Sequence, residues 1–516
     1  MTWLSACADD AASVDDASVD AAEDAARDAA PPPSDPYTCI TAPDVDLSER
    51  APAMWDGNPS DFDMAVEAAV TPEDIAERPT AFEMGVQTGE MTNEGALFWT
   101  RYSGDADTLE LWVWRDSMAD GAVLMAHRQP VGAIVDELYV HERVSSLAPA
   151  TVYQYAFVEL NAMGEPVGRS RLGRVRTAPP PGTRLLTTAA STTCVGTSNE
   201  MARLARTPYI ALGNMAMASP DMILHLGDII YNDRMITLQE YRDNWVRNLG
   251  DPGYQSLLAS AGMFATWDDH EVTNNWDGET IDPARLAVAR QTYFEHLAVR
   301  PGPEGRIWRS HPWGDSVEVF VLDARSERLP STQTTDNPVF VSQAQMDWLK
   351  AGLLASTAHF KVVLTSVNIA NLPGAAGWDI PLGYDDRWEG YGAQRVELLD
   401  HIVNNRIENV WFLAGDIHVG FVGMLEPEGP YSSMWEITVG PGASSVNPLG
   451  ALYELNPERQ PHVFRCDQFL FGHGRAEIET QLEFDPVANA VHVMFRDAVT
   501  SETLFDQWLQ QNWVEG

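Results

Sequence analysis

Short apolar runs that alternate with polar positions occupy the chain from about residue 82 to residue 177. They are rich in β-branched and aromatic residues, and turn-rich stretches such as SGDAD and NAMGEP separate them. The clearest runs are GALFWTRY, TLELWVWRD, ELYVHERV, TVYQYAFVEL and RLGRVRT. Short strands at this spacing predict an Ig- or fibronectin-like β-sandwich, which we place at residues 79–178.

The pattern changes after the proline-rich linker Thr177–Gly182, where continuous apolar runs alternate with segments of helical periodicity. The apolar runs predict buried parallel strands at Met222–Leu226, Met263–Thr266, Val317–Leu322, Lys361–Thr365 and Val410–Leu413. The periodic segments predict helices at Leu238–Leu249, Pro283–Leu297, Ser342–Ala355 and Ala393–Asn404. This alternation predicts an α/β layered domain over residues 183–500, followed by a C-terminal tail at 501–516.

The first 36 residues follow neither pattern. Asp9–Pro36 is mainly Ala, Asp, Ser and Pro, so it cannot bury enough apolar surface to fold, and we expect a flexible acidic tether. Residues 37–78 are expected to form an irregular lead-in segment. Before the tether, Leu4–Cys7 has the pattern of a bacterial lipoprotein cleavage site, without the charged and apolar regions that normally precede one. We expect an exported protein whose start lies further upstream, with Cys7 lipidated; a chance tetrapeptide is the alternative.

The net charge of the chain limits the classes of partner that we expect it to bind. Acidic residues outnumber basic ones 75 to 33, which gives a formal net charge of −42. So acidic a surface repels nucleic acid and anionic membrane faces, and we expect no nucleic-acid-binding surface. No apolar run is long enough to span a bilayer, so a membrane contact is expected only through a lipid anchor at Cys7. The same acidity suits a secreted protein in salty water.

Four short blocks of polar residues follow apolar runs in the α/β region. They are TTC at 192–194, HLGDIIY at 225–231, TWDDHEVTNN at 266–275 and LAGDIH at 413–418. Their Cys, Asp, Tyr, His and Asn side chains are metal-binding types. Sites in open α/β sheets form just beyond the carboxyl ends of strands, so the four blocks predict one metal site assembled from distant parts of the chain.

Asp228 and Tyr231 belong to the second block. Gly227 precedes Asp228, and its missing side chain lets a ligand approach closely. We expect the Asp228 carboxylate to bridge two cations and Tyr231 to bring a phenolate to the same centre. Considered alone, the block leaves open an equal alternative, in which Asp228 caps a helix and Tyr231 packs in the core.

The third block places three carboxylates, an imidazole and two amides within a few residues of a strand. Asp269 or one of Asn274 and Asn275 is a candidate metal ligand, and His270 is a candidate to face the substrate. The alternative is a solvated loop in which Asp268 caps the following turn.

Asp416 and His418 stand two residues apart, so in an extended segment they point to the same side. Imidazole plus carboxylate suits iron, zinc or manganese; a strand-to-loop turn with a hydrogen-bonded histidine is the alternative. Cys194 is a thiolate candidate, although a lone cysteine is most often a small buried apolar residue. If Cys194 binds metal and Cys7 is lipidated, Cys39 and Cys466 remain as a candidate disulfide, whose pairing the sequence does not establish.

The order of these blocks resembles the alkaline phosphatase D (PhoD) family of metallophosphoesterases over about residues 80–500. The supporting stretches are GVQTGEMTNEGALFWTR, VFVLDARSER, SQAQMDWLKAGLLAS and WEGYGAQRVELL. The resemblance implies a four-layer fold of two β-sheets flanked by helices, and a site containing Fe(III) and calcium. It also implies a ligand set of Cys194, Asp228, Tyr231, Asp269, Asn274 or Asn275, Asp416 and His418. Cys194 and Tyr231 would hold Fe(III) and Asp228 would bridge to calcium; the metal bound by each remaining ligand is left open.

The resemblance also implies an activity, the hydrolysis of phosphate esters by direct attack of a metal-bound hydroxide, with His270 stabilising or protonating the leaving oxygen. Phosphodiesters are the first expectation, and phosphomonoesters accompany them. Thr193 and Asn232 replace the family's usual Ser and Glu, which puts substrate preference in doubt more than catalysis. One competing hypothesis is a non-catalytic, surface-anchored binding protein with a degenerate enzyme domain, but every expected ligand position is filled. A different metal-dependent hydrolase or an oxidase is another, and the sequence does not predict the oligomeric state.

Overall fold

The computed structural model describes residues 40–59, 71–116, 123–132, 138–197, 208–372, 386–447 and 467–511. Cys7, Cys39 and Cys466 lie outside these residues, so the lipid anchor, the tether and the disulfide remain predictions. No helix in the described part of the chain is both long and apolar enough to cross a membrane.

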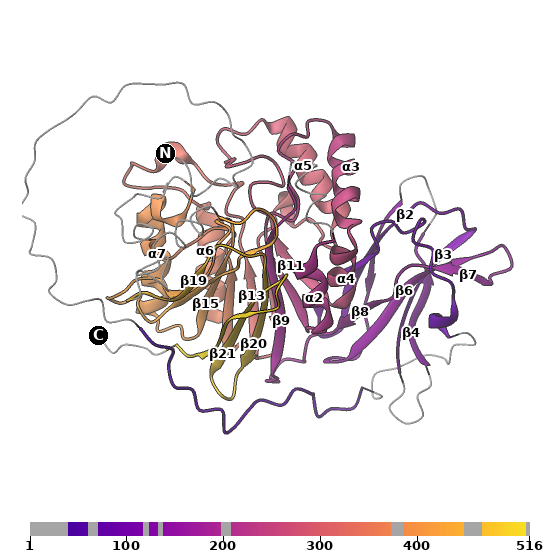
Figure 1. The fold of residues 1–516 in the computed structure, drawn as a ribbon, viewed down its shortest axis with the longest axis horizontal. Helices are drawn as coiled ribbons and strands as arrows, with labels where there is room; N and C mark the ends of the chain where they lie inside the picture. The colour runs from indigo at the N-terminus through magenta and orange to yellow at the C-terminus, as the bar shows by residue number, and fades with distance from the viewer. Residues whose placement is uncertain are drawn as a thin grey trace, which may run out of the picture.

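Two large sheets face each other at the centre of the molecule (Figure 1). In spatial order, the first contains β22 (Thr503–Leu509), β21 (Ala490–Asp497), β20 (Ile478–Asp485), β9 (Thr187–Val195), β10 (Met222–Leu226), β11 (Gly262–Thr266), β1 (Val86–Thr92), β2 (Gly95–Tyr102) and β5 (Leu138–Val144), and β18 (Pro441–Ala443) pairs with β9. The second contains β12 (Arg309–Trp313), β13 (Val317–Val321), β14 (Phe360–Leu364), β15 (Val410–Ala414), β17 (Trp435–Thr438), β16 (Gly420–Met424) and β19 (Phe469–His473).

Helices cover the outer faces of both sheets and complete the four layers expected from the sequence (Figure 1). Those beside the first sheet are α2 (Ile210–Met217), α3 (Leu238–Leu249), α4 (Pro252–Ser260) and α5 (Pro283–His296); those beside the second are α6 (Gln343–Ala355) and α7 (Gly392–Asn404). Alternation along β13 shows why the layers form. Val319 packs in the core between the sheets, whereas Phe320 packs in the core shared with α6 and α7.

The predicted strands and helices of the α/β region are confirmed, most of them to within two residues. Helix α3 illustrates the local signals. The Thr237 side chain accepts a hydrogen bond from the Glu240 backbone N–H, and the Glu240 carboxylate accepts one from the Thr237 N–H at 2.8 Å. This reciprocal capping box fixes the first turn of the helix.

The N-terminal β region has the predicted two-sheet character. Its second sheet consists of β4 (Val123–Pro130), β3 (Thr108–Asp116), β6 (Val152–Leu160) and β7 (Pro166–Arg169), with β8 (Gly173–Arg176) paired to β6. Its other sheet, β1-β2-β5, continues the first α/β sheet, because β1 pairs in parallel with β11 at Gly89 and Met263. A Cβ on Gly89 would lie 2.2 Å from the Ala298 carbonyl oxygen, so this junction requires glycine. The backbone pairing therefore crosses the boundary placed at residue 178.

The C-terminal tail predicted at 501–516 differs from the structure over residues 503–509. These residues form β22, which pairs antiparallel with β21, and Leu509 is fully buried. The Trp435 indole N–H donates to the Gln510 carbonyl at 3.0 Å, which ties this end to the second sheet. A seven-residue strand at a sheet edge carries a weak sequence signal, so neighbouring strands decide its conformation.

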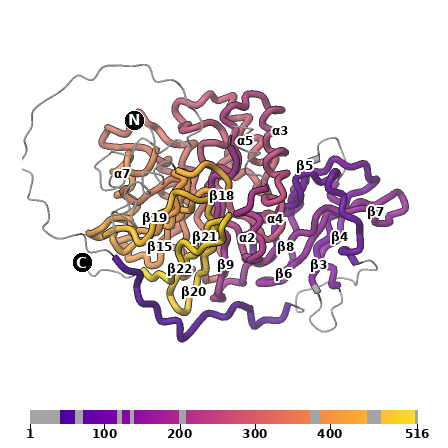
Figure 2. The backbone as a smooth tube through the Cα atoms, in the orientation of Figure 1, coloured from indigo at the N-terminus to yellow at the C-terminus, as the bar shows by residue number. Residues whose placement is uncertain are grey.

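Residues 40–59 of the lead-in run along the lower edge of the molecule in an extended path (Figure 2). Arg50 pairs with Asp485 and Glu483 next to the β20–β21 turn. Further along, the Pro52 carbonyl accepts from the Leu186 N–H at 2.9 Å, and the Ala53 carbonyl accepts from Arg176 Nη2 at 2.9 Å. The segment is irregular, as expected, and it connects the far end of the first sheet to the N-terminal β region.

Candidate metal centre

The four predicted blocks meet at the carboxyl ends of their strands. Cys194 lies at the end of β9, Asp228 two residues beyond β10, Asp269 three beyond β11 and Asp416 two beyond β15. Each of these side chains is buried. The structure therefore brings the distant blocks together, as the strand-end argument predicted.

Five residues of the centre adopt the left-handed backbone conformation. The φ angles are 51° at Cys194, 52° at Asp228, 53° at Asn275, 67° at Asp416 and 54° at His418. Non-glycine residues adopt positive φ rarely, and each such residue costs on the order of 1–3 kcal/mol. Five of them around one point indicate that the surrounding fold holds these side chains in place at the expense of local backbone stability.

The first group of ligand atoms contains sulfur, oxygen and nitrogen. Ligand atoms of Cys194, Asp228 and His418 lie within 4.8 Å of one another. The Tyr231 hydroxyl lies 3.5 Å from Asp228 Oδ2 and 3.1 Å from His418 Nε2. His418 donates from Nδ1 to the Ser445 carbonyl, which leaves Nε2 facing the group.

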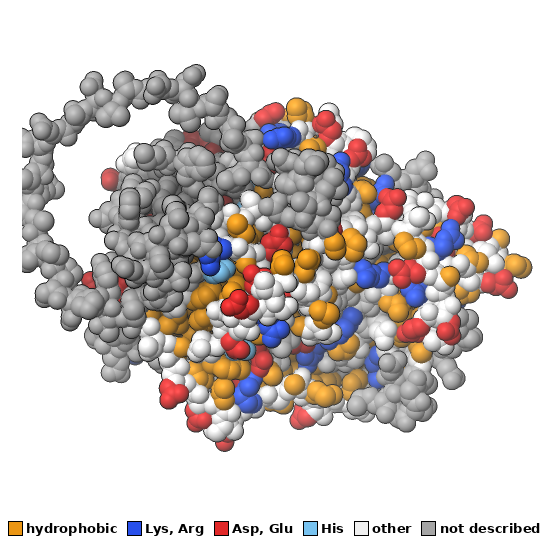
Figure 3. All heavy atoms as spheres, in the orientation of Figure 1, with side chains coloured by type: hydrophobic (Ala, Val, Ile, Leu, Met, Phe, Trp, Pro, Cys, Tyr) orange, Lys and Arg blue, Asp and Glu red, His pale blue; other side chains and the backbone are white. Residues whose placement is uncertain are grey.

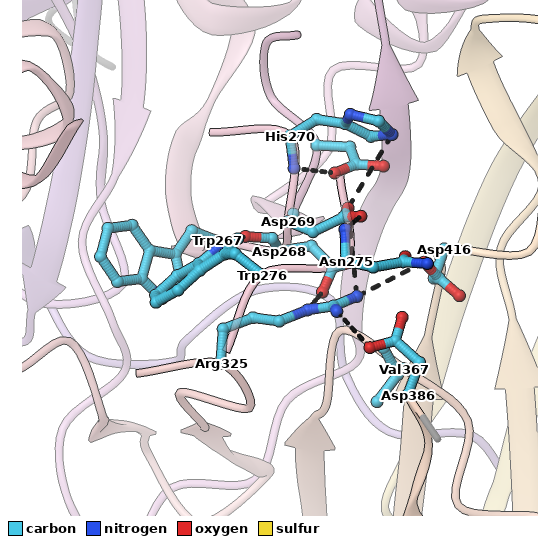
Figure 4. Close-up of polar contacts among 12 residues, drawn as sticks. Trp267, Asp268, Asp269, His270, Asn275, Trp276, Arg325, Val367, Asp386 and Asp416 are labelled. Atoms are coloured by element: carbon cyan, nitrogen blue, oxygen red, sulfur yellow. Dashed lines mark hydrogen bonds and ion pairs between the residues drawn. The ribbon is translucent and has the colours of Figure 1, made fainter. Parts of the chain in front are cut away.

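The third block supplies the next group. Ligand atoms of Asp228, Asp269 and His270 lie within 4.8 Å of one another, so Asp228 belongs to two groups. Asp269 Oδ2 accepts from the Asn275 backbone N–H at 2.6 Å. Asn275 lies beside Asp269 and Asp416 (Figure 4), whereas the Asn274 side chain is exposed. Of the two candidate amides, the structure therefore places Asn275 at the centre.

A third group consists of carboxylates alone. Asp268, Asp269 and Asp416 lie within the same 4.8 Å limit, so Asp269 is also shared. The buried guanidinium of Arg325 donates to Asp268 at 2.6 Å and reaches Asp416 at 3.5 Å (Figure 4). Its Nη1 donates to Asp386 at 2.5 Å. Asp268 Oδ2 and Asp416 Oδ2 are buried and have no hydrogen-bond partner among the described residues, which fits a cation.

The electrostatics of the carboxylates follow from burial and crowding. Burial first, and then the Cys194 thiol and the neighbouring carboxyl groups, raise the pKa of Asp228 well above its usual value. Burial and Asp268 do the same for the pKa of Asp416. Burial raises the pKa of Asp268 to about 6, although Arg325 opposes this rise. Several buried acids so close together repel one another when ionised, and cations bound between them would relieve that repulsion.

His270 is held by a carboxylate that the sequence analysis did not single out. Its Nδ1 lies 2.8 and 2.9 Å from the two oxygens of Asp233, and its ring stacks on Tyr231 at a centroid distance of 4.0 Å. The buried Nε2 makes no hydrogen bond within the described structure and lies 3.9 Å from Asp269 Oδ1. Burial, the largest influence, lowers the pKa of His270, but Asp269 and Asp233 together raise it to about 10.

Glu271 connects the second block to the third through backbone hydrogen bonds. Its buried carboxylate accepts backbone N–H bonds from Asp228 at 3.3 Å, Ile229 at 2.6 Å and Asp268 at 2.8 Å. Burial raises its pKa to about 8, although these hydrogen bonds oppose the rise. The turns after β10 and β11 are therefore positioned relative to each other by one side chain.

The two departures from the family pattern make contacts within the protein. Thr193 Oγ1 donates to the Gly227 carbonyl at 3.1 Å. Asn232 is fully buried, and its side chain accepts from Asn244 at 2.9 Å. Both side chains support the strand ends, and their structural contacts carry no information about the substrate.

The residues missed from the sequence are Asp233, Asp268 as a member of the centre, Glu271, Arg325 and Asp386. Asp233 follows the second block by two residues, and Glu271 lies within the third. Arg325 lies in the stretch VFVLDARSER, where LDAR follows an apolar strand. That arrangement, a polar group at a strand end, is the signal that could have found it.

Comparisons with known proteins show the family to which the chain is similar. Residues 202–480 match the model of the PhoD-like phosphatase family, and residues 67–179 match that of the PhoD-like phosphatase N-terminal domain. Alkaline phosphatase D of Bacillus subtilis (strain 168) is 27% identical over 399 residues, which cover 67% of this chain and 65% of that relative, just under two thirds of its length. Cys194 lies between the two matched ranges.

Two solved structures share the fold. A structure of PhoD superposes with a TM-score of 0.65 and 22% identity, covering 84% of this chain and 93% of the other. The purple acid phosphatase PPD1 from yellow lupin (Lupinus luteus) superposes with a TM-score of 0.55 and 13% identity, covering 83% of this chain and 73% of the other. At these identities the likeness concerns the fold alone.

Proposed function

Because the chain belongs to the PhoD-like phosphatase family, we propose that it hydrolyses phosphate esters at the metal centre described above. The observation that carries this proposal is the overlap of the three ligand groups, in which Asp228 and Asp269 are each shared. A shared carboxylate can bridge two cations, and adjacent cations are the arrangement that phosphate-ester hydrolysis uses. A non-catalytic protein predicts a lost ligand position, but every expected ligand type is present at the centre.

The donor atoms fit two kinds of cation. The Cys194 thiolate and the Tyr231 phenolate are anionic ligands that suit Fe(III). The oxygen-only group of Asp268, Asp269 and Asp416, with the Asn275 amide beside it, suits calcium. When bound, the cations would neutralise the charge of the ester and lower the pKa of a nearby water.

The chain itself supplies a proton donor. Asp233 holds His270 through Nδ1, so Nε2 carries the second proton of the imidazolium. Nε2 has no hydrogen-bond acceptor among the described residues, and it is available to the leaving oxygen of a bound ester. The protonated ring would therefore stabilise or protonate that oxygen as it departs.

The proposals on substrate class, export and lipid anchoring rest on the sequence. Phosphodiesters are the expected substrates, with phosphomonoesters hydrolysed alongside them. The LSAC tetrapeptide and the acidic stretch after it support export and a lipid anchor at Cys7. On the face shown in Figure 3, basic side chains are scattered among acidic ones, in keeping with a small phosphate ester as the partner.

Hydrolysis of matched chromogenic diesters and monoesters at alkaline pH tests the proposal, with the enzyme as purified, after chelation, and after adding back Fe(III) and calcium. Loss on chelation and recovery with both metals is the expected result. Asp228→Asn should abolish turnover while the unfolding midpoint of the folded protein changes little. Hydrolysis by this variant at the wild-type rate would overturn the assignment of the centre.

A further inference from the structure

A second cavity lies in the N-terminal β region and shares no lining residue with the metal centre. Its volume is about 490 Å³, which is within the range of small-molecule sites. The lead-in segment forms one wall, and strands β3, β6 and β8 contribute to the other. Apolar side chains dominate the lining, including Met54, Trp55 and Val152, and Arg115 and Arg176 also contribute to it.

Arg115 is unusual among the buried arginines. The structure describes seven, and the other six, Arg169, Arg176, Arg325, Arg328, Arg387 and Arg395, each pair with a carboxylate. Arg115 is 6% exposed, forms no ion pair with a described residue, and its buried Nε and Nη2 atoms have no hydrogen-bond partner there. A buried charge without a partner is strongly unfavourable, so the free protein retains this group at a cost to stability.

Arg176 offers a second donor to the same cavity. Its Nη1 donates to Asp221 at 2.6 Å and its Nη2 to the Ala53 carbonyl at 2.9 Å, which fixes the guanidinium. Its Nε is buried and has no partner among the described residues. Two arginines that line one cavity and retain unused N–H donors are an arrangement suited to recognising an oxyanion.

We propose that this cavity binds a small organic anion. Its carboxylate or phosphate oxygens accept hydrogen bonds from the guanidinium groups of Arg115 and Arg176. Its apolar body packs against Trp55 and Val152, of which Val152 is exposed. The site is separate from the metal centre, and its occupation does not depend on the phosphoesterase activity.

Calorimetric titration of the full-length, metal-loaded protein tests the proposal, with benzoate and phenylphosphonate as the two probes. Wild type should bind one equivalent of each probe in this cavity. Arg115→Met should bind that equivalent at least about tenfold more weakly, or not at all. The two probes distinguish a carboxylate from a phosphate ligand. Inorganic phosphate lacks the apolar body and should bind this cavity at least about tenfold more weakly than phenylphosphonate. Equal affinity of the two would overturn the proposal that the ligand is organic.

Arg128→Met is the matched control, since Arg128 lies on the neighbouring strand and already pairs with Glu110 at 3.0 Å. It should bind both probes as wild type does. Arg115→Met should hydrolyse phosphate esters normally and unfold at the same or a higher temperature, because no ion pair with a described residue is lost. Unchanged binding of both probes to Arg115→Met, or a lower unfolding temperature with no probe bound by wild type, would show that Arg115 is structural.

A second variant covers the case in which Arg115→Met does not fold. Val152 lines the cavity and is 41% exposed, so Val152→Glu should fold. The carboxylate introduced at position 152 would occupy the place of the ligand's anionic group. Neither probe should then bind in the cavity. Wild-type affinity in this variant would overturn the proposal.

Discussion

The carboxylate of Asp233 holds the imidazole of His270 through Nδ1, at 2.8 and 2.9 Å, while His270 Nε2 makes no hydrogen bond with any residue that the structure describes. Asp233 also accepts from the Asn274 N–H at 2.7 Å, so it fixes the loop and the ring together. Asp233 is therefore a positioning residue, because it acts on the substrate only through His270.

Asp233→Asn should lower kcat by about 10- to 100-fold and change KM little, because removing the carboxylate misorients the proton donor. The charge of Asp233 helps to raise the pKa of His270 to about 10. Without it, the alkaline limb of the kcat profile should move to lower pH. A pH-rate profile of both proteins checks this, and an equal fall in kcat at every pH would indicate a purely structural role.

Tyr231→Phe should remove the visible absorption that Fe(III) gives when bound by phenolate. The Tyr231 hydroxyl lies 3.5 Å from Asp228 and 3.1 Å from His418, so its loss leaves the other donors in place. Absorption spectra and metal analysis of the reconstituted protein measure the effect. Tyr241→Phe is the control, because that buried hydroxyl donates to the Val272 carbonyl, away from the ligand groups. Identical spectra for Tyr231→Phe and wild type would contradict the phenolate assignment.

Arg325→Met should destabilise the protein by about 3–5 kcal/mol, because it leaves Asp268, Asp386 and Asp416 buried without their common cation. Added calcium should restore part of this loss by occupying the carboxylate group. Urea unfolding with and without calcium measures both effects. Arg242→Met, which breaks a more exposed pair with Glu295, should cost less than about 1 kcal/mol and show no calcium effect.

Two buried histidines contribute stability that should be lost in acid. Burial lowers the pKa of His225 and of His296 to about 3, below the value of about 6.5 for an unfolded chain. The unfolded state therefore takes up protons first, and stability present above about pH 6.5 is lost progressively towards pH 3. Each histidine should account for about 2 kcal/mol at pH 5.

His296→Gln isolates one of these contributions. The difference in unfolding free energy between variant and wild type should be constant above pH 7 and should move in favour of the variant as the pH falls to 5. Urea titrations at several pH values measure it. A difference that stays constant across the range would mean that His296 is already protonated in the folded protein.

The strand ends of the α/β region explain how much of the site the sequence could predict. Apolar runs such as Met222–Leu226 and Val410–Leu413 identify buried strands, and parallel strands end at one edge. Blocks that follow them, such as the one ending in Asp416 and His418, must then converge. Local pattern and tertiary structure agree here, so the apolar runs alone predict the strands and the edge of the sheet at which the four blocks meet.

The residues that were missed depend on contacts between segments. Arg325 and Asp386 form an ion pair although 61 residues separate them in the chain, and no sequence pattern around either residue predicts the pairing. Strand β22 and the pairing of β1 with β11 likewise depend on an edge that only the assembled sheet presents. The choice between Asn274 and Asn275 required the conformation of the turn, which sets the Asn275 φ at 53°.

The position of β9 has a consequence for synthesis. This strand carries Cys194, and its antiparallel neighbour β20 aligns Leu482 with Ala189, 293 residues later in the chain. A ribosome must therefore produce almost the whole polypeptide before residues Thr187–Ser191 of β9 gain their partner on this edge, and until then that edge can pair with other chains. Folding of the metal centre should be a late, post-translational event, and nascent chains that end before residue 478 should depend on chaperones to remain soluble.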